Sequence, residues 1–223
     1  GIAWGVPLLF KSRDFSKIIL FPAGIIVVII CMILTNQQCR YWKNSETIFR
    51  HALRVTERNY LAHSSLGVTL FNQNRINESF YHFNKAIGIA PDIHGYYINR
   101  GNAYVKLGQT QPAIHDYTKA ISLKQNYADA YYNRGTLYGK IGQYNLAIED
   151  LNKAITLKPD HFKAFNNRGI VYNQMGLLQK SLDDFNEAIR LKPDYADAYN
   201  NRASLHFDMK NTDWGCIDAK KAC

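Results

Sequence analysis

Amide side chains recur along this sequence at one fixed interval, and their chemistry suits them to hold another chain. Asparagines stand 34 residues apart at Asn99, Asn133, Asn167 and Asn201, with Ser65 in the corresponding earlier position. A primary amide can donate a hydrogen bond to a peptide carbonyl and accept one from a peptide N–H, so a row of amides can bind an extended peptide without reading its sequence. The alternative is that each amide bonds to the adjacent repeat and locks packing. The column therefore predicts either a peptide-binding row or a set of packing contacts between repeats.

Two further columns combine arginine with aspartate at the same interval. Their members are Arg100, Asp116, Arg134, Asp150, Arg168, Asp184, Arg202 and Asp218. Both charges are missing together one interval earlier, where Leu66 and His82 stand. Joint presence and joint absence predict a structural ladder of ion pairs, each joining helices of the same or of neighbouring units and fixing their register. The alternative is a row of arginines without aspartate partners that binds acidic peptide.

No combination of residues predicts catalysis, a metal or a cofactor. The sequence contains no P-loop, His-Glu-x-x-His, Gly-x-Ser-x-Gly or Cys-x-x-Cys motif, and its seven histidines and four cysteines lack metal-ligand spacing. The net charge is +9, and residues 1–59 account for much of it, with eight Lys or Arg against three Asp or Glu. Nucleic-acid binding would need a basic stripe interleaved with aromatic residues, which this distribution does not provide. We therefore expect no catalytic residue, no metal, no cofactor and no nucleic-acid partner for this chain.

The same interval defines the helices that must carry these columns. Small residues repeat with it, first as Gly67, Gly101, Gly135 and Gly169, and then as Ala86, Ala120, Ala154, Ala188 and Ala222. Prolines follow at Pro91, Pro159 and Pro193. Small residues let two helices approach closely, and proline ends a helix. The spacing predicts helix-turn-helix units of 34 residues that stack in a row.

From Tyr60 to the end, this pattern resembles the tetratricopeptide repeat family. The resemblance implies an all-α solenoid, a right-handed superhelix whose concave groove takes a protein or peptide partner. An asparagine ladder lines that face in the similar repeats of O-linked N-acetylglucosamine transferase. The expected units are 60–93, 94–127, 128–161 and 162–195, followed by a truncated unit at 196–223.

The N-terminal quarter of the chain has a different composition. Residues 18–35 carry no charge and would span about 27 Å as a helix, enough for a bilayer core. They predict a transmembrane helix within 18–38, through which the chain would contact the membrane. A cleaved signal peptide is the alternative, although no small-x-small cleavage site follows. Residues 1–17 are expected to be the end of an earlier membrane segment plus a short basic loop, and residues 40–57 a junction helix resembling the second helix of a repeat unit.

The order of membrane segment, junction (YWKNSETIFRHAL) and repeats resembles bacterial relatives of the transmembrane and tetratricopeptide repeat proteins, which are grouped with lipid-linked-sugar-dependent O-mannosyltransferases. The resemblance implies that this chain is the C-terminal part of a polytopic membrane protein, and that it recruits acceptor protein for a glycosyltransferase-like domain preceding Gly1. It also implies the bacterial inner membrane, with the repeats in the periplasm. Two alternatives stay open: repeats that face the cytoplasm, because basic residues flank both ends of the membrane segment, and a membrane-anchored assembly scaffold without sugar chemistry.

Overall fold

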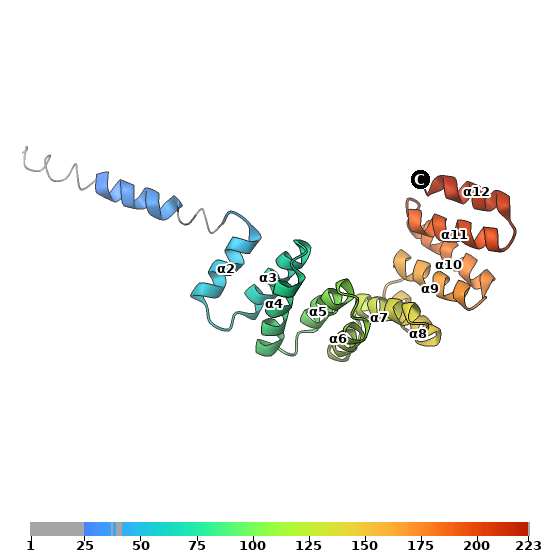
Figure 1. The fold of residues 1–223 in the computed structure, drawn as a ribbon, viewed down its shortest axis with the longest axis horizontal. Helices are drawn as coiled ribbons and strands as arrows, with labels where there is room; N and C mark the ends of the chain where they lie inside the picture. The colour runs from blue at the N-terminus through green and yellow to red at the C-terminus, as the bar shows by residue number, and fades with distance from the viewer. Residues whose placement is uncertain (1–24, 37, 39–41, 223) are drawn as a thin grey trace, which may run out of the picture.

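Helices follow one another in chain order along a curved array (Figure 1). The structure is a computed structural model that describes residues 25–36, 38 and 42–222, and within these ranges it contains helices and no strand. After a helix over 25–36, the elements are α2 (Ser45–Val55), α3 (Tyr60–Asn72), α4 (Ile76–Ile89), α5 (His94–Lys106), α6 (Thr110–Leu123), α7 (Ala128–Lys140), α8 (Tyr144–Leu157), α9 (Phe162–Gln174), α10 (Leu178–Leu191), α11 (Ala196–Asp208) and α12 (Thr212–Lys221). The described part of the chain is therefore all-α.

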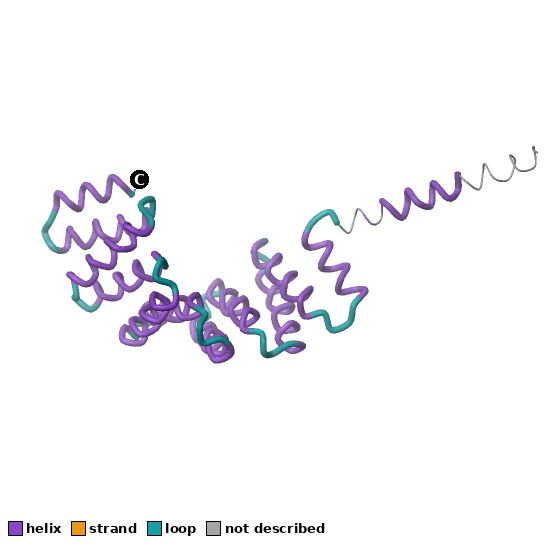
Figure 2. Tube along the Cα trace, turned by 180° about the vertical axis from the view of Figure 1, so that it is seen from behind, coloured by secondary structure: helices purple, strands orange, loops and turns teal. Residues whose placement is uncertain are grey.

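From α3 onward the helices form antiparallel pairs that stack into a solenoid (Figure 2). Three residues separate the two helices of each pair, and four residues separate one pair from the next. The second helix of each pair packs against the first helix of the next pair, and first helices also contact one another, as α7 does α9 and α9 does α11. Because first helices meet across the stack, they line the inner side of its curve.

Close approach of the two helices in a pair depends on the glycine column. Phe83, Tyr117, Leu151 and Phe185 are fully buried side chains of the second helices, and they face Gly67, Gly101, Gly135 and Gly169 respectively. A Cβ atom on Gly135 would lie 2.9 Å from the Cβ of Asp150 and 3.1 Å from the backbone oxygen of Ala147. A larger residue at Gly135 would therefore push the two helices apart.

The turn inside each pair requires one residue in the left-handed conformation. This residue is Asn74, Gly108, Gly142, Gly176 or Lys210, with φ between 62° and 77°. A Cβ atom makes that conformation costly, and lysine gains nothing locally to offset the cost.

We expect Lys210→Gly to stabilise the last pair by about 0.5–1 kcal/mol, because glycine removes the strain of φ 62° at this exposed position. Gly142→Ala, at φ 77°, is the matched control and should destabilise its pair by about 1 kcal/mol. Urea unfolding followed by circular dichroism measures both changes. Equal midpoints for Lys210→Gly and the parent chain would show that the turn carries no strain.

The segment before α3 packs onto the first pair through α2. Asn44 caps α2, accepting a hydrogen bond from the backbone N–H of Thr47 at 2.9 Å. Arg75 joins α2 to the first pair, because its Nη1 lies 2.9 Å from Glu46 Oε1. The helix α2 thus continues the stack on its N-terminal side.

The residues expected to lie in the membrane are only partly described. Residues 25–36 are helical, and their large apolar side chains are exposed, with Ile26, Val27 and Leu34 among those that are more than half exposed. Among the residues that the structure describes, no helix combines the length and the apolar character needed to cross a bilayer. The remaining parts of the expected membrane helix, residues 18–24 and 37, and the whole of 1–17 lie outside the described residues.

Candidate peptide-binding groove

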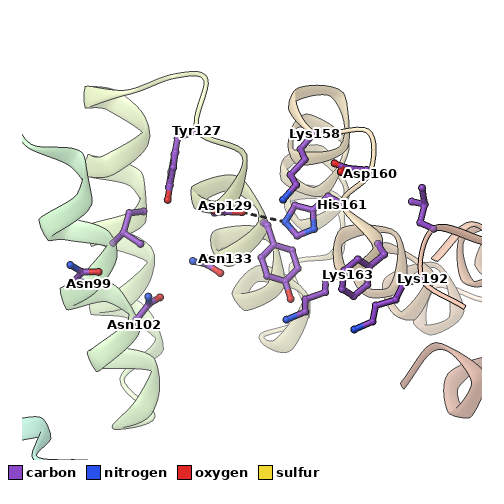
Figure 3. A pocket seen from close by; sticks show the side chains of 14 residues that line it. Asn99, Asn102, Tyr127, Asp129, Asn133, Lys158, Asp160, His161, Lys163 and Lys192 are labelled. Atoms are coloured by element: carbon purple, nitrogen blue, oxygen red, sulfur yellow. Dashed lines mark ion pairs between the residues drawn. The ribbon is translucent and has the colours of Figure 1, made fainter. Parts of the chain in front are cut away.

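Three connected pockets form a groove on the inner side of the array. The large pocket, of about 800 Å³, lies among α5, α7, α9 and the loops that precede α7 and α9 (Figure 3). The middle pocket, of about 290 Å³, shares Asn102, Tyr132 and Asn133 with it. The small pocket, of about 170 Å³, shares Thr136 and Lys140 with the middle one. These shared walls make one continuous groove along the first helices.

Two members of the asparagine column line the large pocket with unengaged amides. Asn99 projects from α5 and Asn133 from α7, and both are half-buried. Neither side chain forms a hydrogen bond with any other residue that the structure describes. Asn102, which lines the same pocket, accepts a hydrogen bond from the Tyr117 hydroxyl at 2.7 Å. Each free amide can offer both a donor and an acceptor to a ligand backbone.

The other two members of the column are bonded to the preceding repeat. Asn167 Nδ2 donates to Thr136 Oγ1 at 2.9 Å and to the Tyr132 hydroxyl at 3.4 Å. Asn201 Nδ2 donates to Asn166 Oδ1 at 2.9 Å. The structure therefore does not make the four asparagines equivalent: Asn99 and Asn133 line the large pocket with free amides, whereas Asn167 lines the small pocket while bonded to α7, and Asn201 is bonded to α9.

We expect Asn167→Ala to lower the free energy of unfolding by about 1 kcal/mol, because it removes a half-buried hydrogen bond between α9 and α7. Asn99→Ala is the matched control from the same column, and it should leave stability within about 0.5 kcal/mol of the parent chain. Chemical denaturation of the two variants measures the difference. Equal losses of stability in both variants would contradict the distinction between the engaged Asn167 and the free Asn99.

His161 closes the large pocket on the side opposite the free amides. Its ring packs against Tyr132 with centroids 4.7 Å apart, and its Nε2 lies 3.5 Å from Asp129 Oδ1. Burial lowers the pKa of His161, although the nearby Asp129 carboxylate opposes the shift. Its buried Nε2 has no hydrogen-bond partner among the described residues.

The charged residues around the large pocket are mixed in sign. Lys158, Lys163 and Lys192 line it together with Asp129 and Asp160. Sequence reasoning did not single out these residues or His161. Lys158 and Lys192 could have been found, because they recur with Lys124 every 34 residues, but Lys163 could not, since Asp129 and Asp197 stand at its equivalent positions. His161 has no such counterpart, since the equivalent residues are Tyr127 and Tyr195.

The arginine and aspartate columns form bidentate pairs within each unit. The closest contacts are Arg100 Nε to Asp116 Oδ2 at 2.7 Å, Arg134 Nε to Asp150 Oδ2 at 2.7 Å, Arg168 Nη2 to Asp184 Oδ1 at 2.6 Å, and Arg202 Nε to Asp218 Oδ2 at 2.7 Å. The Nη1 atom of each arginine also donates to a side chain of the preceding unit, for example Asn84 at 2.7 Å from Arg100. The guanidinium groups are thus engaged in the stack and are not free for a ligand.

Burial determines the electrostatics of this ladder. It raises the pKa of the Asp150 and Asp184 carboxyls, while the hydrogen bonds from Arg134 and Arg168 oppose that shift. The cost of desolvation largely offsets the attraction within such a pair, so the ladder contributes register more than net stability.

The first unit replaces this pair with two histidines. His82 occupies the aspartate position, and its Nδ1 lies 3.0 Å from His63 Nδ1. Burial lowers the pKa of His82 to about 4, helped by the proximity of His63 and Arg50. In the described part of the chain, no three His, Cys, Asp or Glu side chains come together as a metal site.

Comparison with known proteins matches the repeats to one family. Models described as TPR repeat and as tetratricopeptide repeat match residues 101–142, 128–161 and 162–195. No curated protein sequence matches the chain. A tetratricopeptide repeat protein from Parabacteroides merdae is 25% identical, with a TM-score of 0.70 over 79% of this chain and 70% of its own.

Two further solved structures share the fold. YrrB, a tetratricopeptide repeat protein with an unusual peptide-binding site, is 22% identical, with a TM-score of 0.64 over 78% of this chain and 90% of its own. PilF of Pseudomonas aeruginosa is 19% identical, with a TM-score of 0.68 over 75% of this chain and 77% of its own. Residues 101–195 therefore match the models of tetratricopeptide repeats, and the array as a whole shares its fold with solved tetratricopeptide repeat proteins.

Proposed function

We propose that this chain is a membrane-tethered, non-enzymatic module that holds an extended protein segment in the groove defined above. The observation that carries the proposal is the pair of unengaged amides, Asn99 and Asn133, on adjacent first helices in the large pocket. An extended peptide presents a carbonyl and an N–H at every residue, and an amide can pair with both. The peptide-binding site of the structurally similar YrrB supports the same use of this fold.

The proposed tether is the apolar segment within residues 18–38. Its support is the uncharged run over 18–35 and the exposed apolar surface of the helix over 25–36. We place the repeats in the periplasm at the bacterial inner membrane, with a cytoplasmic orientation as the alternative. In this proposal the groove recruits acceptor protein for a glycosyltransferase-like membrane domain outside this chain. Flotation of the 223-residue chain with lipid vesicles tests the tether, and a chain left at the bottom of the gradient would refute it.

An assembly scaffold without sugar chemistry is the second candidate. The observation that favours it is that three large apolar side chains of the last pair are exposed, namely Phe207, Trp214 and Ile217, which we take as one patch. Exposed apolar groups that lie together mark interaction surfaces. A scaffold would use this patch in addition to the groove, whereas an acceptor-recruiting module needs the groove alone.

Binding to a peptide array tests the groove directly. The parent chain should bind many extended peptides, and the double variant Asn99→Ala/Asn133→Ala should bind them about tenfold or more weakly, because two hydrogen bonds of about 1 kcal/mol each are lost. The matched control is Asn77→Ala/Asn145→Ala, which removes two exposed amides of the second helices and should bind as the parent does. Equal binding by the two double variants would contradict the proposal, and so would a parent chain that binds no peptide.

A further inference from the structure

Gly139 borders a pocket in the groove, at a position that carries a side chain in the other pairs. The equivalent residues in the other pairs are Phe71, Val105, Asn173 and Phe207. Gly139 lies inside α7 with ordinary helical geometry, since the glycines with positive φ are Gly108, Gly142 and Gly176 among the described residues. Glycine inside a helix lowers stability relative to alanine. The backbone therefore does not require glycine at this position.

The space beside Gly139 is the small pocket, and its walls are mainly apolar. Leu151, Ile170 and Val171 form these walls, and a Cβ atom on Gly139 would lie 3.0 Å from Val171 Cγ2. A volume of about 170 Å³ is comparable to cavities of about 150 Å³ that accept benzene. One leucine-sized side chain therefore fits the small pocket.

Unpaired positive charge adjoins this apolar space. Lys140 lines both the small and the middle pocket, and Lys106 lines the middle one. Both lysines are exposed and form no ion pair with any residue that the structure describes. Neither pocket has an acidic residue in its lining, in contrast to the large pocket with Asp129 and Asp160. The charge at this end of the groove is thus complementary to a carboxylate.

We propose that the groove selects an extended segment carrying an apolar side chain, seated in the small pocket beside Gly139, with an acidic side chain two residues away that meets Lys140 and Lys106. The inference rests on the proposed function and adds the ligand class to it. Side chains two residues apart in an extended chain lie on one face about 7 Å apart, and a flexible lysine can reach over that distance. Desolvation of the apolar group gives affinity, and the lysines give selectivity and salt dependence.

The test uses the 223-residue chain and fluorescent ten-residue peptides that differ only at their centre. The central sequences are Leu-Ala-Glu, Leu-Ala-Gln, Ser-Ala-Glu and Ser-Ala-Gln, with a second set in which the two variable residues are adjacent. Fluorescence anisotropy measures each dissociation constant. We expect the Leu-Ala-Glu peptide to bind about tenfold more tightly than the Ser-Ala-Glu peptide, and to weaken as salt is raised. The set with adjacent residues should lose the preference for Glu, because neighbouring side chains of an extended chain point to opposite faces.

Two kinds of variant separate the two contacts. Gly139→Val, which copies Val105 of the preceding pair, should abolish the preference for Leu and keep the preference for Glu. Ile170→Ser makes the pocket polar without adding volume, so it should have the same effect even if Gly139→Val perturbs folding. Lys140→Glu should abolish the preference for Glu alone, whereas Lys119→Glu, on the second helix α6, should change neither preference.

The outcomes distinguish this inference from the proposed function. A parent chain that binds all peptides equally would overturn the inference and leave groove binding intact. Preferences that survive both Gly139→Val and Ile170→Ser would place the apolar contact elsewhere and also overturn it. A parent chain that binds no peptide at all would refute the proposed function, and the inference with it.

Discussion

Asp150→Ala should lower the free energy of unfolding of the repeat array by about 3–5 kcal/mol, because removing one partner of a buried ion pair leaves the other charge uncompensated. Asp150 is 6% exposed and accepts two hydrogen bonds from Arg134, at 2.7 and 2.8 Å. The Arg134 guanidinium carbon lies 5.9 Å and 5.7 Å from the ring centroids of Tyr131 and Tyr138, and the side chain is 17% exposed, so water only partly replaces the lost carboxylate. Urea unfolding monitored by circular dichroism measures the loss.

The matched control for Asp150→Ala removes both charges. The double variant Arg134→Leu/Asp150→His copies the first unit, which carries Leu66 and His82 at these positions. Replacing a whole buried pair costs less than breaking it, so the double variant should be more stable than Asp150→Ala. If Asp150→Ala unfolded at the same midpoint as the parent chain, the arginines would not depend on their aspartates, and the ladder could not be structural.

Acid should selectively weaken the first unit, by about 3 kcal/mol between pH 6.5 and 4, because folding holds the pKa of His82 at about 4. The Nδ1 atoms of His63 and His82 are 3.0 Å apart, so one donates to the other and only one carries a proton. An unfolded histidine has a pKa near 6.5. Below that value the unfolded chain binds more protons than the folded one, so stability falls as the pH is lowered towards 4.

His82→Asn isolates the histidine contribution to this acid sensitivity. Asparagine keeps a donor and an acceptor near His63 but does not titrate. The parent chain and the variant should differ in the slope of stability against pH between 6.5 and 4, since the carboxylates that titrate in this range are common to both. Parallel slopes would show that the histidine pair does not control acid unfolding.

The helices and their pairing could be predicted from the 34-residue interval, because small residues and prolines report close approach and helix ends directly. The arginine–aspartate ladder could be predicted as a set of pairs, since its two columns appear and vanish together. The sequence could not predict which aspartate each arginine contacts, because a strict period fits pairing within a unit and pairing between units equally well. In the structure the carboxylate is in the same unit, and a third contact, such as Arg100 to Asn84, reaches the preceding one.

The behaviour of the asparagine column depended on neighbours outside the column. Asn167 bonds to Thr136, whereas the residue equivalent to Thr136 one unit earlier is Asn102, which is held by the Tyr117 hydroxyl. The residue equivalent to Tyr117 in the next unit is Leu151, which has no hydroxyl. Two differences between neighbouring units, Asn102 against Thr136 and Tyr117 against Leu151, thus accompany the free Asn133 and the engaged Asn167. The small pocket could not be predicted either, because one glycine within a helix does not reveal the volume beside it.

The side-chain amide signals of selectively ¹⁵N-labelled asparagine give the most direct test of groove binding. On addition of an extended peptide, the NH₂ signals of Asn99 and Asn133 should shift as they bond to the peptide backbone, while those of Asn77 and Asn145 on the second helices should not move. Single substitutions assign each signal. The account would be contradicted if the peptide bound with Asn99 and Asn133 unchanged, because the ligand would then occupy a surface other than the groove.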